Sequence, residues 1–302
     1  MTRSSWDGIG ERTTMQTLEI YQSLWGMQLR DPNRSERTDE ESFAMVSDAG
    51  FDGMCLDPSV AEIPENLERH PLFEKYRLGC MVNAFPNSPA DMRPLLDFAQ
   101  QMNACMVNVI SGVMPIRPED AVPVVRQWIG EARDKEMPLL FETHRDGLLN
   151  DLYFTLQLMD LVPEMRLCAD LAHFVVDREF RAPMPERDQH YIAAVLERSD
   201  CFQGRIASRE QVQIQIDFLQ HQEWVEIFKG WWMQGMRMWR KRNTCNAKLV
   251  FLCELGPPPY AITDAHQNEL SDRWKESLQI RDWVRAIWTQ LDSEDELTGG
   301  DS

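Results

Sequence analysis

Short apolar runs alternate with segments of helical pattern along the whole chain, and this alternation constrains the fold more than any other feature. Apolar runs of this length, closed by Asp, Gly or Pro, are typical of buried strands. The predicted strands span residues 18–25, 51–56, 78–85, 105–111, 138–142, 167–170, 201–207 and 248–254. The predicted helices span residues 39–49, 63–76, 89–102, 118–135, 150–161, 185–198, 224–241 and 264–291, the last in two pieces. Such alternation predicts an α/β protein with a closed parallel (β/α)8 TIM barrel in a single domain.

The chain length fits one barrel domain with short extensions. Of the 302 residues, a barrel of this kind typically needs about 250. We expect a polar N-terminal extension over residues 1–16, the barrel over 17–291, and an acidic disordered tail over 292–302. A doubly wound open sheet is the alternative, but the sequence carries neither glycine-rich nucleotide-binding motif.

Charge and cysteine usage exclude several classes of partner. The formal net charge of −18 argues against nucleic acid and against anionic membranes. No apolar run reaches the length of about 18 residues that a membrane span needs. The start, Met1–Asp7, lacks the apolar core of a secretory signal, and the seven cysteines fit no disulfide framework. These features predict reduced thiols and a cytoplasmic location.

Three predicted strands end in a carboxylate. Glu142, Asp170 and Glu254 close strands five, six and eight, and the polar Gln203 lies in strand seven. In a parallel barrel the carboxyl ends of the strands face one mouth, so these side chains should converge. Carboxylates this close repel one another unless a cation lies among them. We therefore expect a divalent metal site, with Mg²⁺ or Mn²⁺ favoured and Co²⁺ or Zn²⁺ as alternatives, unless each acid pairs with a separate surface arginine.

Two histidines and an arginine follow the same strand ends. His144 and His173 lie two and three residues beyond the carboxylates of strands five and six, and each is either a structural or a functional residue. Arg205 either holds a substrate oxygen through a charge-assisted hydrogen bond or pairs with one of the carboxylates. Trp25, Phe85 and Tyr260, at other strand ends, are predicted to form the apolar walls of a pocket.

One predicted helix is unusually rich in aromatic residues. Their helical spacing favours core packing and a partner-facing surface over a ligand-binding site. The residues are Trp224, Phe228, Trp231, Trp232, Met236 and Trp239.

At its strand ends the chain resembles the xylose-isomerase-like barrel family, which includes sugar isomerases, ketose 3-epimerases, inosose dehydratases and type IV endonucleases. The resemblance lies in Phe-Glu-Thr-His (141–144), Asp-Leu-Ala-His (170–173), Gln-Gly-Arg-Ile (203–206) and Glu-Leu-Gly-Pro-Pro-Pro-Tyr (254–260). It implies that Glu142, Asp170, Gln203 and Glu254 hold the metal, with Gln203 standing where the family more often has His. It also implies that His173 contacts the substrate and that Glu142 and Glu254 move the proton. The endonuclease branch, which uses more histidine ligands and a basic groove, is similar only in fold, since this acidic chain has six histidines.

These observations lead to one principal functional hypothesis and two alternatives. The first is a manganese-dependent sugar isomerase or epimerase of carbohydrate metabolism, acting on a neutral sugar with Glu142, Glu254 and His144 as catalytic groups and His173, Arg205 and Trp25 binding the substrate. The second is a lyase that cleaves a 3-keto-glycoside, resembling C-glycoside deglycosidase subunits, with His144 as base or acid. A homo-oligomer is expected in the first case, and a hetero-oligomer with a small β-rich subunit in the second. The third is a non-enzymatic binding protein on a decayed barrel, which only Gln203 favours.

Overall fold

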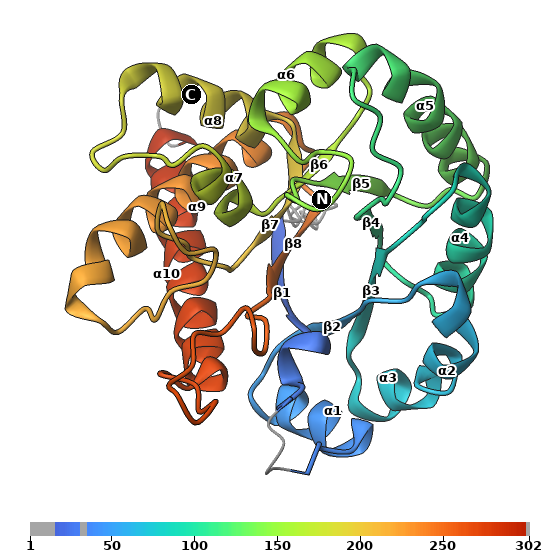
Figure 1. The fold of residues 1–302 in the computed structure, drawn as a ribbon, viewed down its shortest axis with the longest axis horizontal. Coiled ribbons are helices and arrows are strands. Elements are labelled where there is room, and N and C mark those ends of the chain that lie inside the picture. The colour runs from blue at the N-terminus through green and yellow to red at the C-terminus, as the bar shows by residue number, and fades with distance from the viewer. Residues whose placement is uncertain (1–15, 31–34, 300–302) are drawn as a thin grey trace, which may run out of the picture.

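Eight parallel strands form a closed barrel in which each strand pairs with its neighbour in the sequence and β8 pairs with β1. The structure is a computed structural model that describes residues 16–30 and 35–299. Figure 1 shows the strands as a central ring with the helices around it. The strands are β1 (Thr17–Ser23), β2 (Gly53–Leu56), β3 (Gly79–Ala84), β4 (Val107–Val109), β5 (Leu139–Glu142), β6 (Leu167–Ala169), β7 (Ser199–Gln203) and β8 (Lys248–Cys253). The predicted (β/α)8 fold is confirmed.

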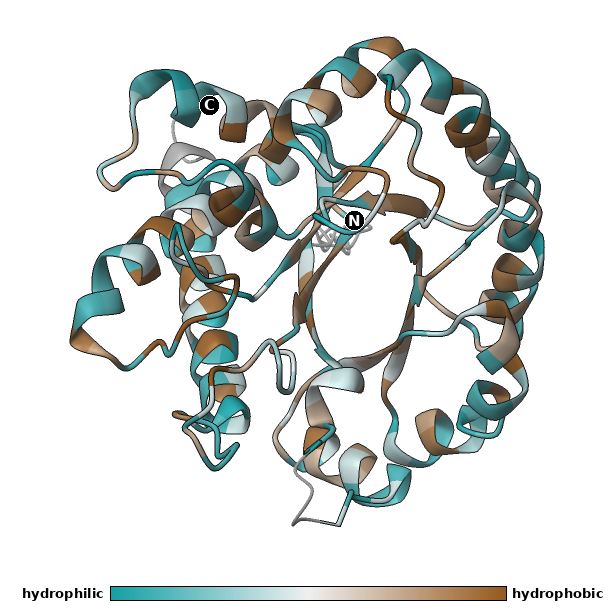
Figure 2. Ribbon diagram, in the orientation of Figure 1, coloured by the Kyte–Doolittle hydropathy of each residue, from teal (hydrophilic) through white to brown (hydrophobic). Residues whose placement is uncertain are grey.

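The helices cover the outside of the barrel with their apolar faces turned toward the strands (Figure 2). They are α1 (Asp39–Asp48), α2 (Ile63–Leu67), α3 (His70–Tyr76), α4 (Met92–Gln101), α5 (Pro118–Asp134), α6 (Leu152–Leu161), α7 (Leu171–Asp177), α8 (Glu186–Glu197), α9 (Gln222–Arg242) and α10 (Arg273–Gly299). No helix in residues 16–30 and 35–299 is long and apolar enough to cross a membrane.

Local sequence signals explain where several helices begin. Thr38 and Glu41 form a capping box at the start of α1, in which each side chain accepts the backbone N–H of the other residue. Asp151 caps α6 by accepting two backbone N–H groups. Proline occupies the first turn of α2, α3 and α5, where its missing N–H costs nothing.

The C-terminal region differs from its prediction. We expected a helix in two pieces from residue 264, but residues 264–272 form a loop, and α10 is a single helix from Arg273. α10 also continues through Gly299, whereas the sequence predicted a disordered tail from residue 292. Arginines on α9 explain this difference, because Arg240 pairs with Asp292 and Arg237 pairs with Glu294. Residues 300–302 and the N-terminal extension up to residue 15 lie outside the described residues.

Strands β1 and β7 end earlier than predicted. After Ser23 the chain forms a short 3-10 turn over Trp25–Met27, in which the N–H of Met27 donates to the carbonyl of Leu24 at 2.9 Å. β7 ends at Gln203, and residues 204–218 form an irregular loop over the barrel mouth, so Arg205 lies beyond the strand. Helix α7, directly after β6, was not predicted at all; Asp170 caps it by accepting the N–H of Ala172 at 3.0 Å.

The interior of the barrel is filled by side chains from alternate strand positions. At its N-terminal end the ring of Tyr21 crosses toward β2 and β3, where Gly53 and Gly79 leave room for it. The other apolar side chains of this inner cluster are Cys55, Met81, Met106, Leu140, Cys168, Cys201, Val250 and Leu252. All seven cysteines are free thiols, as predicted, and only Cys245 is exposed.

The aromatic residues of α9 belong to the core of the chain itself. Trp224, the most exposed of the four tryptophans, is 9% exposed, and Trp232 and Trp239 are 2% exposed. The predicted core packing is thus confirmed. Because these indole rings are buried within the chain, they do not form the partner-facing surface that the sequence analysis also considered.

Candidate active site

Glu142, Asp170 and Glu254 meet at the C-terminal mouth of the barrel. Each offers a carboxylate oxygen, and these three atoms lie within 4.8 Å of one another. All three side chains are buried, with at most 4% of any residue exposed. The predicted convergence of the strand-end acids is therefore confirmed.

Two buried asparagines, which the sequence analysis missed, connect the acids around the ring. The amide of Asn108 on β4 donates to Glu142 Oε2 and, at 2.9 Å, to Asn83 Oδ1. The amide of Asn83 on β3 donates in turn to Asp57 Oδ1 at 2.8 Å and to Glu254 Oε1 at 3.2 Å. Asp57 follows β2 and adds a fourth carboxylate to the site. The sequence does contain a signal for these two residues, because each is a single asparagine within an otherwise apolar predicted strand.

Arg205 is a buried clamp between two of the acids. Its Nε donates to Asp170 Oδ2 and its Nη2 to Glu254 Oε2, both at 2.9 Å, while Nη1 donates to Gln213 Oε1 at 3.2 Å. The residue is 1% exposed. Of the two roles that the sequence left open, pairing with carboxylates is confirmed. Since a guanidinium has five N–H donors, two remain after these three bonds.

If all the acids of the site are ionised, their charge exceeds that of Arg205, so either a cation or bound protons must compensate the difference. Four carboxylates face one guanidinium, and burial together with the neighbouring acids raises the pKa of Glu142 well above its usual value. Burial likewise raises the pKa of Glu254 to about 8 and that of Asp57 to about 6. Asp170 differs: burial opposes its ionisation, but His173 and Arg205 beside it hold the pKa of this carboxyl below its usual range.

Two oxygens of the site fit a divalent cation. Glu142 Oε1 and Gln203 Oε1 are buried and, within the described part of the chain, have no hydrogen-bond donor. The amide nitrogen of Gln203 donates to Glu142 Oε2 at 2.6 Å, so Gln203 lies beside Glu142 as predicted. Buried oxygens without partners are costly unless a ligand satisfies them, and carboxylate and amide oxygens suit Mg²⁺ and Mn²⁺. The residues present therefore fit the metal that the sequence predicted.

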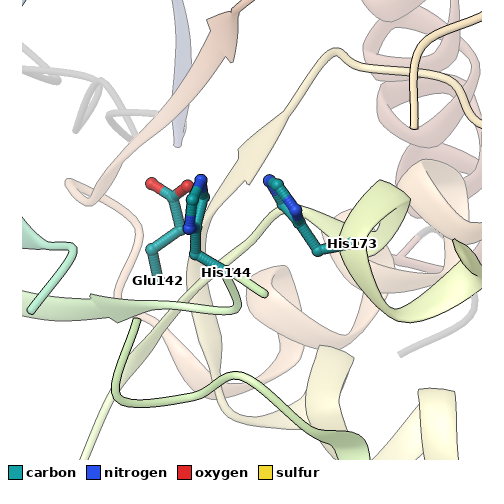
Figure 3. Close-up of side chains that lie close together, drawn as sticks. All are labelled: Glu142, His144 and His173. Atoms are coloured by element: carbon teal, nitrogen blue, oxygen red, sulfur yellow. The ribbon is translucent and has the colours of Figure 1, made fainter. Parts of the chain in front are cut away.

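The rings of the two histidines contact each other at a tilt of 50° beside Glu142 (Figure 3). Their ring centroids are 4.0 Å apart. His173 is fully buried, and neither ring nitrogen makes a hydrogen bond to the described residues, although Nε2 lies 3.4 Å from Asp170 Oδ2. Burial lowers the pKa of His173, and burial together with His173 lowers the pKa of His144 to about 3. Both rings are thus neutral at physiological pH.

A cavity of about 370 Å³ opens above the acids and is large enough for a small molecule. Its apolar walls include Trp25 and Tyr260, whose rings meet edge to face at 5.2 Å. The guanidinium of Arg205 lies 4.8 Å from the ring centroid of Tyr260. The lining residues are Trp25, Asp57, Glu62, Phe85, Ile110, Glu142, His144, Arg205, Glu254 and Tyr260. The predicted aromatic walls are confirmed, and His173, which contacts His144, is not among the lining residues.

No family model and no curated protein matches the sequence. Solved structures match the fold over nearly the whole chain. L-ribulose 3-epimerase has a TM-score of 0.60 at 14% identity, covering 93% of this chain and 98% of that one. A D-tagatose 3-epimerase-like protein has a TM-score of 0.58 at 8% identity, covering 91% and 99%.

The structure of D-allulose 3-epimerase from Methylomonas sp. in complex with D-allulose matches with a TM-score of 0.58 at 11% identity, covering 90% of this chain and 98% of that one. The chain thus shares its barrel fold with these 3-epimerases and with a putative xylose isomerase. At identities this low the likeness establishes the fold alone and leaves the chemistry to the residues of this chain.

Proposed function

We propose that this protein is a divalent-metal-dependent sugar isomerase or epimerase that removes a proton from the carbon next to a carbonyl. The observation that carries the proposal is Oε1 of Glu142, which has no hydrogen-bond partner among the described residues and lies among buried acids at the floor of a cavity of about 370 Å³. The 3-epimerases of similar fold support a sugar as substrate.

In this proposal Glu142, Asp170, Gln203 and Glu254 hold the metal, with Mn²⁺ as the expected ion. Such a cation would polarise the substrate carbonyl and acidify the adjacent C–H bond. Of the two glutamates, Glu142 takes the proton in addition to holding the metal. Both oxygens of Glu254 already accept hydrogen bonds, from Asn83 and Arg205, whereas Oε1 of Glu142 has no donor among the described residues. General bases of this kind contribute about 10²–10⁴-fold to the rate.

The other side chains of the cavity bind and orient the sugar. Trp25 and Tyr260 exclude water and pack on its apolar face. The two free N–H groups of Arg205 donate to a hydroxyl or carbonyl oxygen, and the bound Asp170 keeps the guanidinium in place. The ring of His173 lies 4.0 Å from that of His144 and 6.4 Å from that of Tyr260, both of which line the cavity, so His173 is near enough for the substrate contact that the resemblance implies.

A lyase acting on a 3-keto-glycoside is the second candidate. It begins with the same proton abstraction but then expels a substituent, so it needs no second base to return the proton. The double hydrogen bonding of Glu254 favours this candidate, because epimerisation calls on a group that can deliver a proton to the opposite face. Oligomerisation, a small β-rich subunit and a cytoplasmic location remain predictions from the sequence.

Exchange with solvent tests the proposal. The protein, loaded with Mn²⁺, is incubated in deuterated water with D-allulose, L-ribulose or a 3-keto-glycoside, and deuterium at the carbon next to the carbonyl is measured. Substrate deuterated at that carbon should show a primary isotope effect, and Glu142→Gln should lose both turnover and metal. Turnover with the deuterium fully retained and no isotope effect would contradict proton abstraction. Product analysis separates the two candidates, because only the lyase releases the substituent.

A further inference from the structure

The ring of His144 is fixed by a hydrogen bond from the backbone. The N–H of Asp146 donates to His144 Nδ1 at 3.1 Å, within the turn that follows β5. A ring nitrogen that accepts a hydrogen bond presents its lone pair and carries no proton. In a neutral imidazole the other nitrogen must then carry it. The proton of His144 is therefore at Nε2.

The turn that supplies this N–H is itself held in place. Directly before His144, the N–H of Thr143 donates to the carbonyl of Cys168 at 3.1 Å. The hydroxyl of Thr143 donates to the carbonyl of Asp170 at 2.9 Å. These bonds tie the turn to β6 and to the start of α7. The position of the Asp146 N–H, and with it the tautomer of His144, is set by the scaffold.

The protonated nitrogen of His144 faces the cavity. The ring lines the cavity, and within the described residues Nε2 makes no hydrogen bond. Figure 3 shows the ring between the carboxylate of Glu142 and the ring of His173, with one nitrogen level with that carboxylate. Among the described residues Nε2–H thus has no acceptor, and the ring that carries it lies at the wall against which a substrate would lie.

We infer that His144 donates a hydrogen bond from Nε2, as a neutral imidazole, to the oxygen on which negative charge develops in the substrate. This inference rests on the proposed function and assigns to His144 a role other than the general base that the sequence led us to expect. As Glu142 removes the proton from carbon, the electron pair of the C–H bond moves toward the carbonyl oxygen. The N–H of His144 stays on nitrogen and stabilises that oxygen, as a neutral imidazole can do without being protonated first.

The same hydrogen bond argues against His144 as a metal ligand. Glu142, His144 and His173 offer ligand atoms within 4.8 Å of one another, a set that resembles a two-histidine, one-carboxylate site. A metal needs the lone pair of a ring nitrogen. In His144 the only lone pair, at Nδ1, is already used by Asp146. Coordination through Nε2 would require the other tautomer and would break this bond.

The tautomer can be read directly by NMR. Protein labelled with ¹⁵N at histidine and loaded with diamagnetic Mg²⁺ is measured at neutral pH, and the His144 signals are identified by their absence in His144→Gln. We expect a protonated Nε2 and an unprotonated Nδ1. A proton at Nδ1, or at both nitrogens, would overturn the inference whether or not any sugar is turned over.

Metal content separates a donor from a ligand. His144→Ala and His144→Gln should bind the same amount of Mn²⁺ as the wild-type protein, measured by elemental analysis after gel filtration, whereas Glu142→Gln should lose it. Loss of a metal equivalent in His144→Ala would show that His144 is a ligand and would overturn the inference.

Turnover of D-allulose tests the catalytic part. Removing a donor of this kind typically lowers kcat by about 10²–10³-fold. We expect that loss in His144→Ala and a smaller loss in His144→Gln, whose amide can still donate from a similar position. An equal loss in both variants, or none in either, would contradict the donor role. If the wild-type protein turned over none of the ketoses tried, the proposed function would be wrong. The tautomer of His144 would then still be decided by the NMR measurement.

Discussion

The buried amides of Asn83 and Asn108 decide which oxygens of the site acids remain free. Each amide has two N–H donors, and all four are used on neighbouring acceptors. As a result, Glu254 Oε1 is occupied, whereas one oxygen of Glu142 has no partner among the described residues. The two asparagines thus distinguish Glu142 from Glu254.

Gln203 is the residue at which this chain departs from the ligand set that the resemblance implies. We predict that Gln203→His binds Mn²⁺ and Zn²⁺ at least as tightly as the wild-type protein, because imidazole is a better ligand than a neutral amide oxygen for these ions. Gln203→Leu, the control of similar size without a ligand atom, should weaken binding by roughly 10–100-fold. Isothermal titration with Mn²⁺ measures both. Unchanged affinity in Gln203→Leu would show that Gln203 is not a ligand.

At the scale of the elements, the sequence predicted what depends on local periodicity. Each apolar run became a strand, and Glu142, Asp170 and Glu254 lie at or just after the strand ends where they were expected. What it missed depends on distant partners. Asn83 and Asn108 meet only because β3 and β4 pair in a register that places them side by side. Likewise, α10 extends beyond residue 291 where α9 supplies arginines to its acidic end.

Close packing of Tyr21 against two glycines fixes the distance between β1, β2 and β3. A Cβ atom at Gly79 would lie 2.8 Å from Cζ of Tyr21 and closer still to its hydroxyl oxygen, so we predict that Gly79→Ala lowers the free energy of unfolding by about 1–3 kcal/mol. In a Tyr21→Leu background the same substitution should cost much less. Urea unfolding of the four proteins forms a double-mutant cycle.

A matched control for this cycle lies on α9. Gly230 is helical and exposed, and an added Cβ would meet nothing within 4 Å. Gly230→Ala should therefore stabilise the protein by up to about 1 kcal/mol, since alanine is the better helix former. If Gly79→Ala cost the same in both Tyr21 backgrounds, the clash with the tyrosine ring would not be its cause.

Over the whole molecule, acidic residues outnumber basic ones. The same excess of acidic groups is found among the buried residues of the candidate site. The chain has 49 acidic and 31 basic residues, which gives the net charge of −18. At the surface water screens such charge, but at the barrel mouth four carboxyl groups gather around one buried guanidinium, which pairs with only two of them, Asp170 and Glu254. The stability of the fold should therefore depend on both the metal and pH.

The last prediction concerns this dependence in the metal-free protein. The pKa of Glu254 is raised from 4.5 to about 8, and that of Glu142 is also raised, so the folded state holds protons that the unfolded state has already released. Their contribution to stability is complete below the unfolded pKa and is lost as pH rises toward the folded one. His144 and His173, with lowered pKa values, act in the opposite direction, but their effect fades above about pH 6.5 as the unfolded histidines lose their protons. Between pH 6.5 and 8 the free energy of unfolding should therefore fall.

Urea unfolding in the presence of a chelator, at intervals between pH 6.5 and 8, measures this slope. Glu254→Gln keeps the shape and an oxygen acceptor but cannot ionise, so its slope should be flatter than that of the wild-type protein. With saturating Mn²⁺ the trend should weaken or reverse, because the metal competes with protons for the same carboxylates and stabilises the folded state more as pH rises. A metal-free protein whose stability rose across this interval would show that the buried carboxylates are ionised without a metal, and that Arg205 alone compensates their charge.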